Sequence, residues 1–398
     1  MKTKITNIGS IATWCPIQNQ FTIIRDVDLL LDEYTIIEIG PNILNADREI
    51  DAFGALITPG FVDSHTHPIF SGDRSNEFSM RVDGKTYEEI SQSGGGIISS
   101  IDNVRKSKET ILFDESLIRT NFFLQHGTTT IEAKSGYGLT IEDEIKSLRV
   151  IQRLQQESAL DFVPTFMGAH AFPPEFINDQ DAYIDIICND MIPEISKEKL
   201  AEYCDVFCES GYFSVEQSRK ILESAKKHGM KIRLHADEFK DSGAAELAAE
   251  LDAVTADHLM AVSENGIRSM AQKGVIATLL PGTTLFLGKS DYANGRKIID
   301  MGCDVALATD YNPGSSTIQS MPFILSLACL YCGLSIEEAF IGSTWNGARA
   351  LHRENILGAI SIGYQADLIF WDINTINEIP YWMGSDRIRQ VMKNGVLI

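Results

Sequence analysis

Eight short runs of apolar and β-branched residues alternate with amphipathic helical segments through most of this chain, and no other feature restricts its fold as strongly. Eight strands, each followed by a helix, are what a closed parallel (β/α)8 barrel requires. Gly127, Gly229, Gly274 and Gly302 each stand between a helical segment and the next run, where a left-handed residue is favoured. We predict an α/β fold with a TIM-like barrel over residues 56–354. The predicted strands are LITPGFVDSH, GTTTIEAKS, DFVPTFMGAH, CDVFCE, KIRLHAD, AVTADHL, VIATLLPG and DVALATD.

The two ends of the chain depart from this pattern. Residues 1–55 and 355–398 read as short strands and turns rich in Ile, Val, Gly and Asp. Chain termini tend to lie close together at a domain surface. We therefore predict that both ends form one small, discontinuous β-sandwich domain.

A long segment, about residues 68–113, separates the first predicted strand from the first predicted helix. It contains GDRSNEF and the triplet Gly94, Gly95 and Gly96. Loops of this length are usually functional or disordered. Because it follows a strand at the C-terminal mouth of the barrel, we predict a substrate-binding flap, with a plain surface insertion as the alternative. Whether it closes as a lid is left open by the sequence.

The formal net charge of −21 bounds the partners. It disfavours nucleic acid and anionic membranes, so an anionic small-molecule substrate would need a local cation. The most apolar window, which starts at Met321, is too short to span a bilayer. Seven scattered cysteines and an N-terminus without a secretory signal predict reduced thiols in a cytoplasmic protein. The composition is compatible with a homodimer.

Four predicted strands end in residues that bind metals or handle protons. The first carries His65 and His67, two positions apart and therefore on one strand face. Barrel strands all point the same way, which brings their C-terminal ends into one mouth. Three imidazoles and one carboxylate suit a borderline-soft divalent ion such as zinc or iron. The other strands contribute His235 with Glu238, His258, and Asp310.

Several of these residues have alternative interpretations. His258 is either a buried core histidine or a hydrogen-bond partner of a substrate carbonyl or water. Glu238 either caps a helix or transfers a proton. Asp310, in the turn TDYNPG, either binds backbone amides or points into the mouth.

These motifs resemble the amidohydrolase superfamily, and within it the enzymes that open the imidazolone ring during histidine breakdown. The resemblance covers nearly the whole chain. It implies metal-dependent hydrolysis of the cyclic amide of 4-imidazolone-5-propanoate to N-formimino-L-glutamate, the third step of histidine degradation, with one zinc or iron ion. It rests on PGFVDSHTHPIFSGDR, GTTTIEAKSGYGL, FMGAHAFP, HADEF, ADHL, ALATDYNPGSS and LGAISIGYQADLIFWD.

The resemblance also implies residue roles. Binuclear members usually carry a carboxylated lysine at the end of strand four; here that strand reads CDVFCESGYF, so a single ion is expected. The catalytic residues implied are Glu238, His258 and Asp310. The metal ligands implied are His65, His67, His235 and Asp310. The substrate contacts implied are Arg74, Tyr137, His170, Glu238, Asn312, Gly314 and Ser315.

Two rival functions remain at this point. One is another cyclic amidohydrolase or a nucleobase deaminase of the same superfamily. A nucleobase, however, has no propionate for Arg74, Tyr137 and His170 to hold. The other is a non-catalytic scaffold on the same fold, which the retention of every expected metal ligand disfavours.

Overall fold

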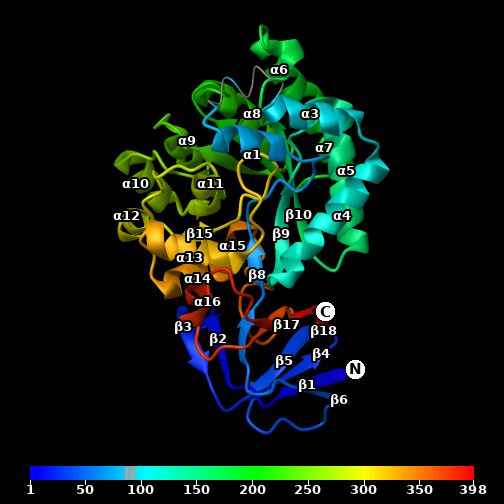
Figure 1. Cartoon of the computed structure of the whole chain (residues 1–398), viewed down its shortest axis with the longest axis vertical. Coiled ribbons are helices and arrows are strands. Elements are labelled where there is room, and N and C mark those ends of the chain that lie inside the picture. The colour runs from blue at the N-terminus through cyan, green and yellow to red at the C-terminus, as the bar shows by residue number, and fades with distance from the viewer. Residues whose placement is uncertain (86–88, 90–94) are drawn as a thin grey trace.

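The computed structural model describes residues 1–398 apart from 86–88 and 90–94. It shows a barrel surrounded by helices and, at one end of the barrel, a smaller domain of β-strands in which both chain termini lie (Figure 1). The barrel positions the candidate site, and the smaller domain lies at the opposite end.

Eight parallel strands form the barrel, in the same order in space as along the chain. Beyond the ends of the first and last strands, the Asp310 N–H donates to the His65 carbonyl at 3.1 Å, and the His67 N–H donates to the Tyr311 carbonyl at 2.8 Å. These bonds close the barrel through the segments that carry predicted metal ligands, and the predicted barrel is confirmed. The strands are β8 (Phe61–Asp63), β9 (Thr128–Lys134), β10 (Asp161–Ala169), β11 (Tyr203–Cys208), β12 (Lys231–Ala236), β13 (Thr255–His258), β14 (Ile276–Leu279) and β15 (Val305–Leu307).

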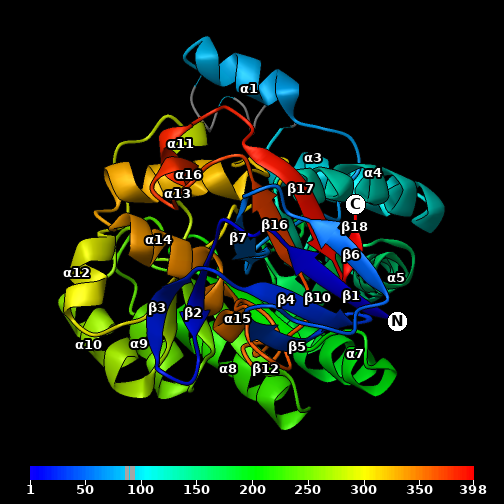
Figure 2. The ribbon, with the colours of Figure 1, turned by 90° about the horizontal axis from the view of Figure 1, so that it is seen from below.

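Helices form the outer layer, seen around the barrel in Figure 2. The four glycines predicted to separate helices from strands all have positive φ, between 70° and 96°. A residue with a Cβ is strained there, so these glycines end the helices as the sequence predicted. The helices that follow the flap are α4 (Glu109–Gln125), α5 (Ile141–Glu157), α6 (Gln180–Ile186), α7 (Ile192–Glu198), α8 (Val215–Lys227), α9 (Ala244–Glu250), α10 (Glu264–Lys273), α11 (Pro281–Phe286), α12 (Gly295–Asp300), α13 (Met321–Tyr331), α14 (Ile336–Ser343), α15 (Trp345–Ala350) and α16 (Glu378–Tyr381).

The smaller domain is built from two sheets that share one hydrophobic core. Leu29 and Ile36 from one sheet and Ile57 and Phe370 from the other are buried in the same cluster, so the two sheets form the predicted sandwich. One sheet has the order β5 (Thr35–Gly40), β4 (Asp28–Asp32), β1 (Lys2–Thr6), β6 (Arg48–Asp51). The other has the order β18 (Val396–Leu397), β17 (Ile388–Lys393), β16 (Leu368–Trp371), β7 (Leu56–Pro59), β2 (Ser10–Cys15), β3 (Gln20–Ile24).

The first predicted barrel strand is in fact two strands. β7 pairs with β16 and β2 in the smaller domain, and only β8 belongs to the barrel. The chain passes from one sheet to the other at Gly60, where a methyl group would lie 2.3 Å from Thr129 Oγ1. The change between sheets therefore falls at Gly60 rather than at residue 55, because a continuous apolar run does not reveal which sheet a strand joins.

The segment predicted to be a flap contains α1 (Ser75–Val82) and α3 (Ile97–Lys106). Figure 1 shows α1 at the end of the barrel away from the smaller domain. Gly94, the first residue of the predicted triplet, lies outside the described residues. Among the helices that the structure describes, none is both long and apolar enough to cross a membrane.

Candidate active site

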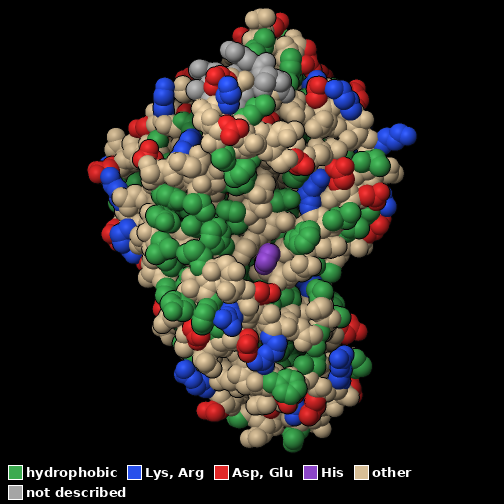
Figure 3. All heavy atoms as spheres, viewed as in Figure 1, with side chains coloured by type: hydrophobic (Ala, Val, Ile, Leu, Met, Phe, Trp, Pro, Cys, Tyr) green, Lys and Arg blue, Asp and Glu red, His purple; other side chains and the backbone are tan. Residues whose placement is uncertain are grey.

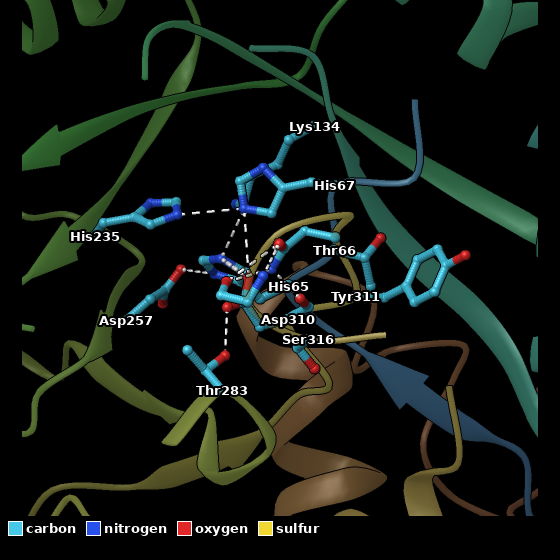
Figure 4. A network of polar contacts seen from close by, with 12 residues as sticks. His65, Thr66, His67, Lys134, His235, Asp257, Thr283, Asp310, Tyr311 and Ser316 are labelled. Atoms are coloured by element: carbon cyan, nitrogen blue, oxygen red, sulfur yellow. Dashed lines mark hydrogen bonds and ion pairs between the residues drawn. The ribbon is translucent and has the colours of Figure 1, made fainter. Parts of the chain in front are cut away.

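Three imidazoles and one carboxylate converge at the C-terminal mouth of the barrel (Figure 4). His67 Nε2 lies 3.3 Å from His65 Nε2 and 3.4 Å from His235 Nε2. Asp310 Oδ1 lies 3.5 Å from His65 Nε2 and 3.6 Å from His67 Nε2. A tetrahedral ion with bonds of about 2.0–2.1 Å places its ligand atoms about 3.3–3.4 Å apart. The spacing of these four predicted ligands therefore fits one divalent ion.

The hydrogen bonds of the imidazoles leave their facing nitrogens unprotonated. His65 Nδ1 lies 2.7 Å from Asp257 Oδ2, and His235 Nδ1 lies 3.0 Å from Asp205 Oδ1. An ionised carboxylate only accepts, so Nδ1 carries the proton and Nε2 presents a lone pair. Burial lowers the pKa of His65 and of His67 well below the usual range, which keeps both rings neutral. Lone pairs and a carboxylate that point together call for a cation between them.

A buried charge network lies beneath these ligands, and its members are fully shielded from solvent. Lys134 Nζ lies 2.7 Å from both Glu132 and Asp205. Arg233 Nη2 lies 3.2 Å from Asp257, and Arg233 Nη1 lies 3.6 Å from Glu132. Because the carboxylates that orient His65 and His235 are themselves paired with cations, the imidazoles are held in one orientation.

The sequence analysis did not identify this network, although the chain carries a signal for it. Glu132 and Lys134 stand two residues apart, as do Arg233 and His235, and residues at that spacing share one strand face. Charged residues within an otherwise apolar barrel strand are costly to bury unless they are paired. Their presence predicts a polar barrel interior under the mouth.

The three predicted catalytic residues lie together. Glu238 Oε2 is 3.8 Å from His258 Nε2, and Glu238 is 8% exposed. Burial raises the pKa of Glu238 to about 8, and the charge of Asp310 acts in the same direction. His258 and Asp310 adopt φ of 77° and 53°. This left-handed conformation is strained for such residues and is typical of functional sites.

The structure also decides between the alternative interpretations. Asp237, not Glu238, accepts the N–H groups of Ala244 and Ala245 at the start of α9. His258 Nδ1 is buried without a hydrogen-bond partner among the described residues, so His258 is not a satisfied core histidine. Asp310 directs Oδ1 toward the imidazoles and accepts a hydrogen bond from Thr283 at Oδ2.

The predicted substrate contacts from the first three strand ends form the rim of the mouth. The His170 ring stacks on His67 with centroids 5.0 Å apart, and its centroid is 5.1 Å from that of Tyr137. Burial raises the pKa of Tyr137, and the positive charge of Arg74 opposes that shift. Tyr137 thus lies within electrostatic reach of Arg74 and beside a ring that covers a candidate ligand.

The turn after β15 is organised by Asn312. Its Oδ1 accepts the N–H groups of Gly314 and Ser315, each at 2.8 Å, and its Nδ2 donates to the Asp310 carbonyl at 2.6 Å. The sequence predicted that the two N–H groups donate to substrate. In the structure they donate to Asn312, so direct contact between this turn and a substrate stays a prediction.

Two residues that the sequence analysis missed fix the loop that carries Tyr137. Glu144 Oε1 accepts three backbone N–H groups of residues 136–139, at 2.9–3.2 Å. Arg105 Nε donates to the Gly138 carbonyl at 2.8 Å, and Arg105 Nη2 lies 2.8 Å from Glu175 in the next loop. Sequence spacing gives no signal for either contact, since each joins a helix to a loop.

Glu209 stands at the tip of β11, where binuclear relatives carry the modified lysine. One of its oxygens accepts the Phe239 N–H at 2.8 Å and the other accepts the Ser210 N–H at 2.7 Å. Glu209 therefore holds the segment that follows Glu238.

Comparisons with known proteins agree with this geometry. Residues 56–398 match the amidohydrolase family. The chain is similar to an imidazolonepropionase from Shouchella clausii, 48% identical over 88% of this chain and 78% of that protein. It is also similar to one from Clostridium tetani, 46% identical over 96% of this chain and 92% of that protein. Among solved structures, a zinc-bound adenosine deaminase from Xanthomonas campestris superposes with a TM-score of 0.75 at 17% identity, covering 100% of this chain and 92% of that one, which shows the fold alone.

Proposed function

Because this chain belongs to the amidohydrolase family, and within it to the imidazolonepropionases, we propose that it hydrolyses the ring amide of 4-imidazolone-5-propanoate. The product is N-formimino-L-glutamate, and the reaction is the third step of histidine degradation. The observation that carries the proposal is the convergence of His65, His67, His235 and Asp310 beside the rim residues that the resemblance assigns to the substrate. The relatives' identity of 44–48% disfavours the deaminase alternative.

A single divalent ion, zinc or iron, is proposed at the four ligands. Both ions accept imidazole and carboxylate ligands. When bound, such an ion polarises a carbonyl group and lowers the pKa of a bound water. The tip of β11 supports one ion rather than two, because Glu209 stands there in place of a lysine and is bonded to backbone N–H groups.

Hydrolysis adds the water oxygen to the carbonyl carbon, breaks the ring C–N bond and delivers a proton to the leaving nitrogen. We assign the acceptance of the water proton to Asp310 and the polarisation of the carbonyl to His258. Glu238 orients the ring and carries the proton to the nitrogen. Its raised pKa, about 8, supports this role, since the carboxyl then holds a proton near neutral pH.

The substrate's propionate is proposed to bind at the rim, through Arg74, Tyr137 and His170. The net charge of −21 makes a local cation necessary for an anionic ligand. Asn312, Gly314 and Ser315 are proposed to line the opposite side of the mouth. We propose no nucleic-acid or membrane partner. The seven cysteines are free, which supports the proposed cytoplasmic location.

A homodimer is proposed on the basis of one apolar face. Figure 3 shows hydrophobic side chains gathered over α11, α13 and α16, and α13 packs against both of the other helices. Leu330, Tyr331 and Tyr381 are 63%, 54% and 74% exposed. Exposed apolar patches of this kind are typical of protein interfaces. Sedimentation of the protein and of Leu330→Glu tests the proposal: a monomeric wild type contradicts it.

The reaction is tested by incubating the purified protein with imidazolonepropionate and following the loss of its absorbance, alongside elemental analysis. We expect turnover and about one metal ion per chain. Failure of the metal-loaded protein to consume this substrate, together with hydrolysis of another cyclic amide or a nucleobase, would overturn the proposal.

A further inference from the structure

The guanidinium of Arg74 is already bound along one of its edges. Arg74 Nε donates to Glu77 Oε1 at 2.9 Å, and Arg74 Nη2 donates to Glu77 Oε2 at 2.7 Å. Both side chains are only 14% exposed. This is the bidentate geometry that orients a planar guanidinium most firmly. One carboxylate within α1 therefore fixes the plane in which Arg74 presents its remaining N–H groups.

The remaining edge of Arg74 lies against a glycine. A methyl group at Gly314 would lie 2.1 Å from Arg74 Nη1 and 2.8 Å from Arg74 Cζ. Gly314 does not have a positive φ, so the backbone does not require a glycine there. The space for the guanidinium does require one. Nη1 is thus directed to the turn after Asp310, which contributes a metal ligand.

Two further contacts hold α1 in this place. Arg81 Nη1 donates to the Gly314 carbonyl at 3.2 Å, and Arg81 also lies 5.1 Å from the ring centroid of Phe286. Glu77 Oε1 accepts the Gly96 N–H at 3.0 Å in addition to its bond with Arg74. Glu77 therefore connects Arg74 to the start of α3, and Arg81 ties the same helix to the turn.

We infer that Glu77 is a positioning residue for substrate choice: it holds Arg74 so that the Nη1 and Nη2 edge faces the carboxylate of an anionic substrate. Gly314 determines specificity with it, because only a residue without a side chain lets the guanidinium seat against the turn. The inference rests on the proposed function, since the carboxylate is that of the propionate. Selection then depends on the direction of the N–H groups rather than on net positive charge, which Glu77 cancels.

This arrangement distinguishes two roles for Glu77. If Glu77 only competed with the substrate carboxylate for Arg74, then Glu77→Gln would strengthen the binding of an anion. If Glu77 positions Arg74, the same change weakens that binding, because the amide cannot accept both N–H bonds. Glu77→Asp keeps the charge but is one methylene shorter, so it also loses the two-bond geometry and should also weaken binding.

The experiment measures binding of imidazole-4-propionate and of imidazole to the metal-loaded protein by calorimetry. We expect Glu77→Gln and Glu77→Asp to weaken imidazole-4-propionate binding by roughly tenfold or more, the scale of hydrogen bonds to charged groups. Binding of imidazole, metal content and melting temperature should stay as in wild type. Asp73→Asn, which removes a neighbouring exposed charge that bonds only Ser75 in the structure, is the matched control and should have no effect.

A double-variant comparison completes the test. In the Arg74→Lys background, Glu77→Gln should cause little further loss, because the lysine has no fork left to orient. Unchanged or tighter binding of imidazole-4-propionate by Glu77→Gln, or additive losses in the double variant, would overturn the inference. Turnover of imidazolonepropionate is measured separately, so a protein that fails to hydrolyse it contradicts the proposed function while the binding result still decides the role of Glu77.

Discussion

The floor and the rim of the mouth are built in different ways. The floor consists of His65, His67, His235 and Asp310, at or just beyond strand ends, above the buried charge network. The rim consists of Arg74, Tyr137, His170 and the turn 312–315, all on loops. Floor residues are fixed by charged side chains from other strands, whereas Arg74, Tyr137 and the turn are fixed within or between loops.

This difference separates two tasks. A floor in which each buried charge is paired resists rearrangement, because the loss of one partner leaves another charge buried alone. A rim held by local contacts changes without disturbing the floor. We conclude that the floor governs whether the amide is cleaved and the rim governs which amide is bound. The following predictions test that separation, from the largest expected effect to the smallest.

The largest effect is expected for His67→Ala. This change removes one of four ligands, so the protein should lose most of its metal and all measurable turnover while the barrel stays folded. Elemental analysis and circular dichroism measure both. Tyr137→Phe, a change at the rim, is the control and should keep its metal. Stoichiometric metal in His67→Ala would contradict the assignment of the floor.

Glu238→Gln should lower kcat by about 10²-fold or more with metal content unchanged, the range for losing general acid-base help. The side chain keeps its size, so the effect reports proton transfer rather than packing. Steady-state kinetics and elemental analysis provide the measurement. A wild-type rate would remove Glu238 from the mechanism.

Arg74→Lys should act on binding alone. The ammonium keeps the charge but loses the fork, so binding of imidazolonepropionate should weaken by about 1.5–3 kcal/mol. The expected signature is a raised KM with kcat and metal content near wild type. A loss of metal in this variant would mean that rim and floor are not separable.

Asp257→Asn tests how the floor is oriented. It removes the charge that holds His65 Nδ1 at 2.7 Å, and changes of this kind typically lower metal affinity about 10–100-fold. Chelator competition measures the affinity, with the melting temperature of the metal-free protein as the control for folding. Affinity equal to wild type would show that Asp257 does not orient the ligand.

The sequence predicted the floor better than the rim, for a geometric reason. In a parallel barrel a residue at a strand end has a known place, so His65, His67, His235 and Asp310 could be brought together from their positions alone. The barrel and the β-sandwich followed from the same periodicity. Lys134 and Arg233 were missed, although the strand spacing that reveals them is present in the sequence.

The contacts of the rim could not be predicted in the same way. Glu77 and Glu144 act through hydrogen bonds whose partners depend on loop conformation, which no residue period encodes. Asn312 was predicted to contact substrate, but its side chain builds the turn. The division of the first apolar run between two sheets was likewise hidden, because β7 and β8 are equally buried.

The central claim is that cleavage and substrate choice are separate, and the rate of hydrolysis of a tail-less 4-imidazolone tests it most directly. The measurement compares wild type and Arg74→Lys on the tail-less ring and on imidazolonepropionate. We predict that the tail-less ring is a poor substrate for both proteins, with equal kcat/KM, while only imidazolonepropionate distinguishes them. Wild type that hydrolyses the tail-less ring as efficiently as imidazolonepropionate, or an Arg74→Lys variant that loses activity equally on both, would contradict the account.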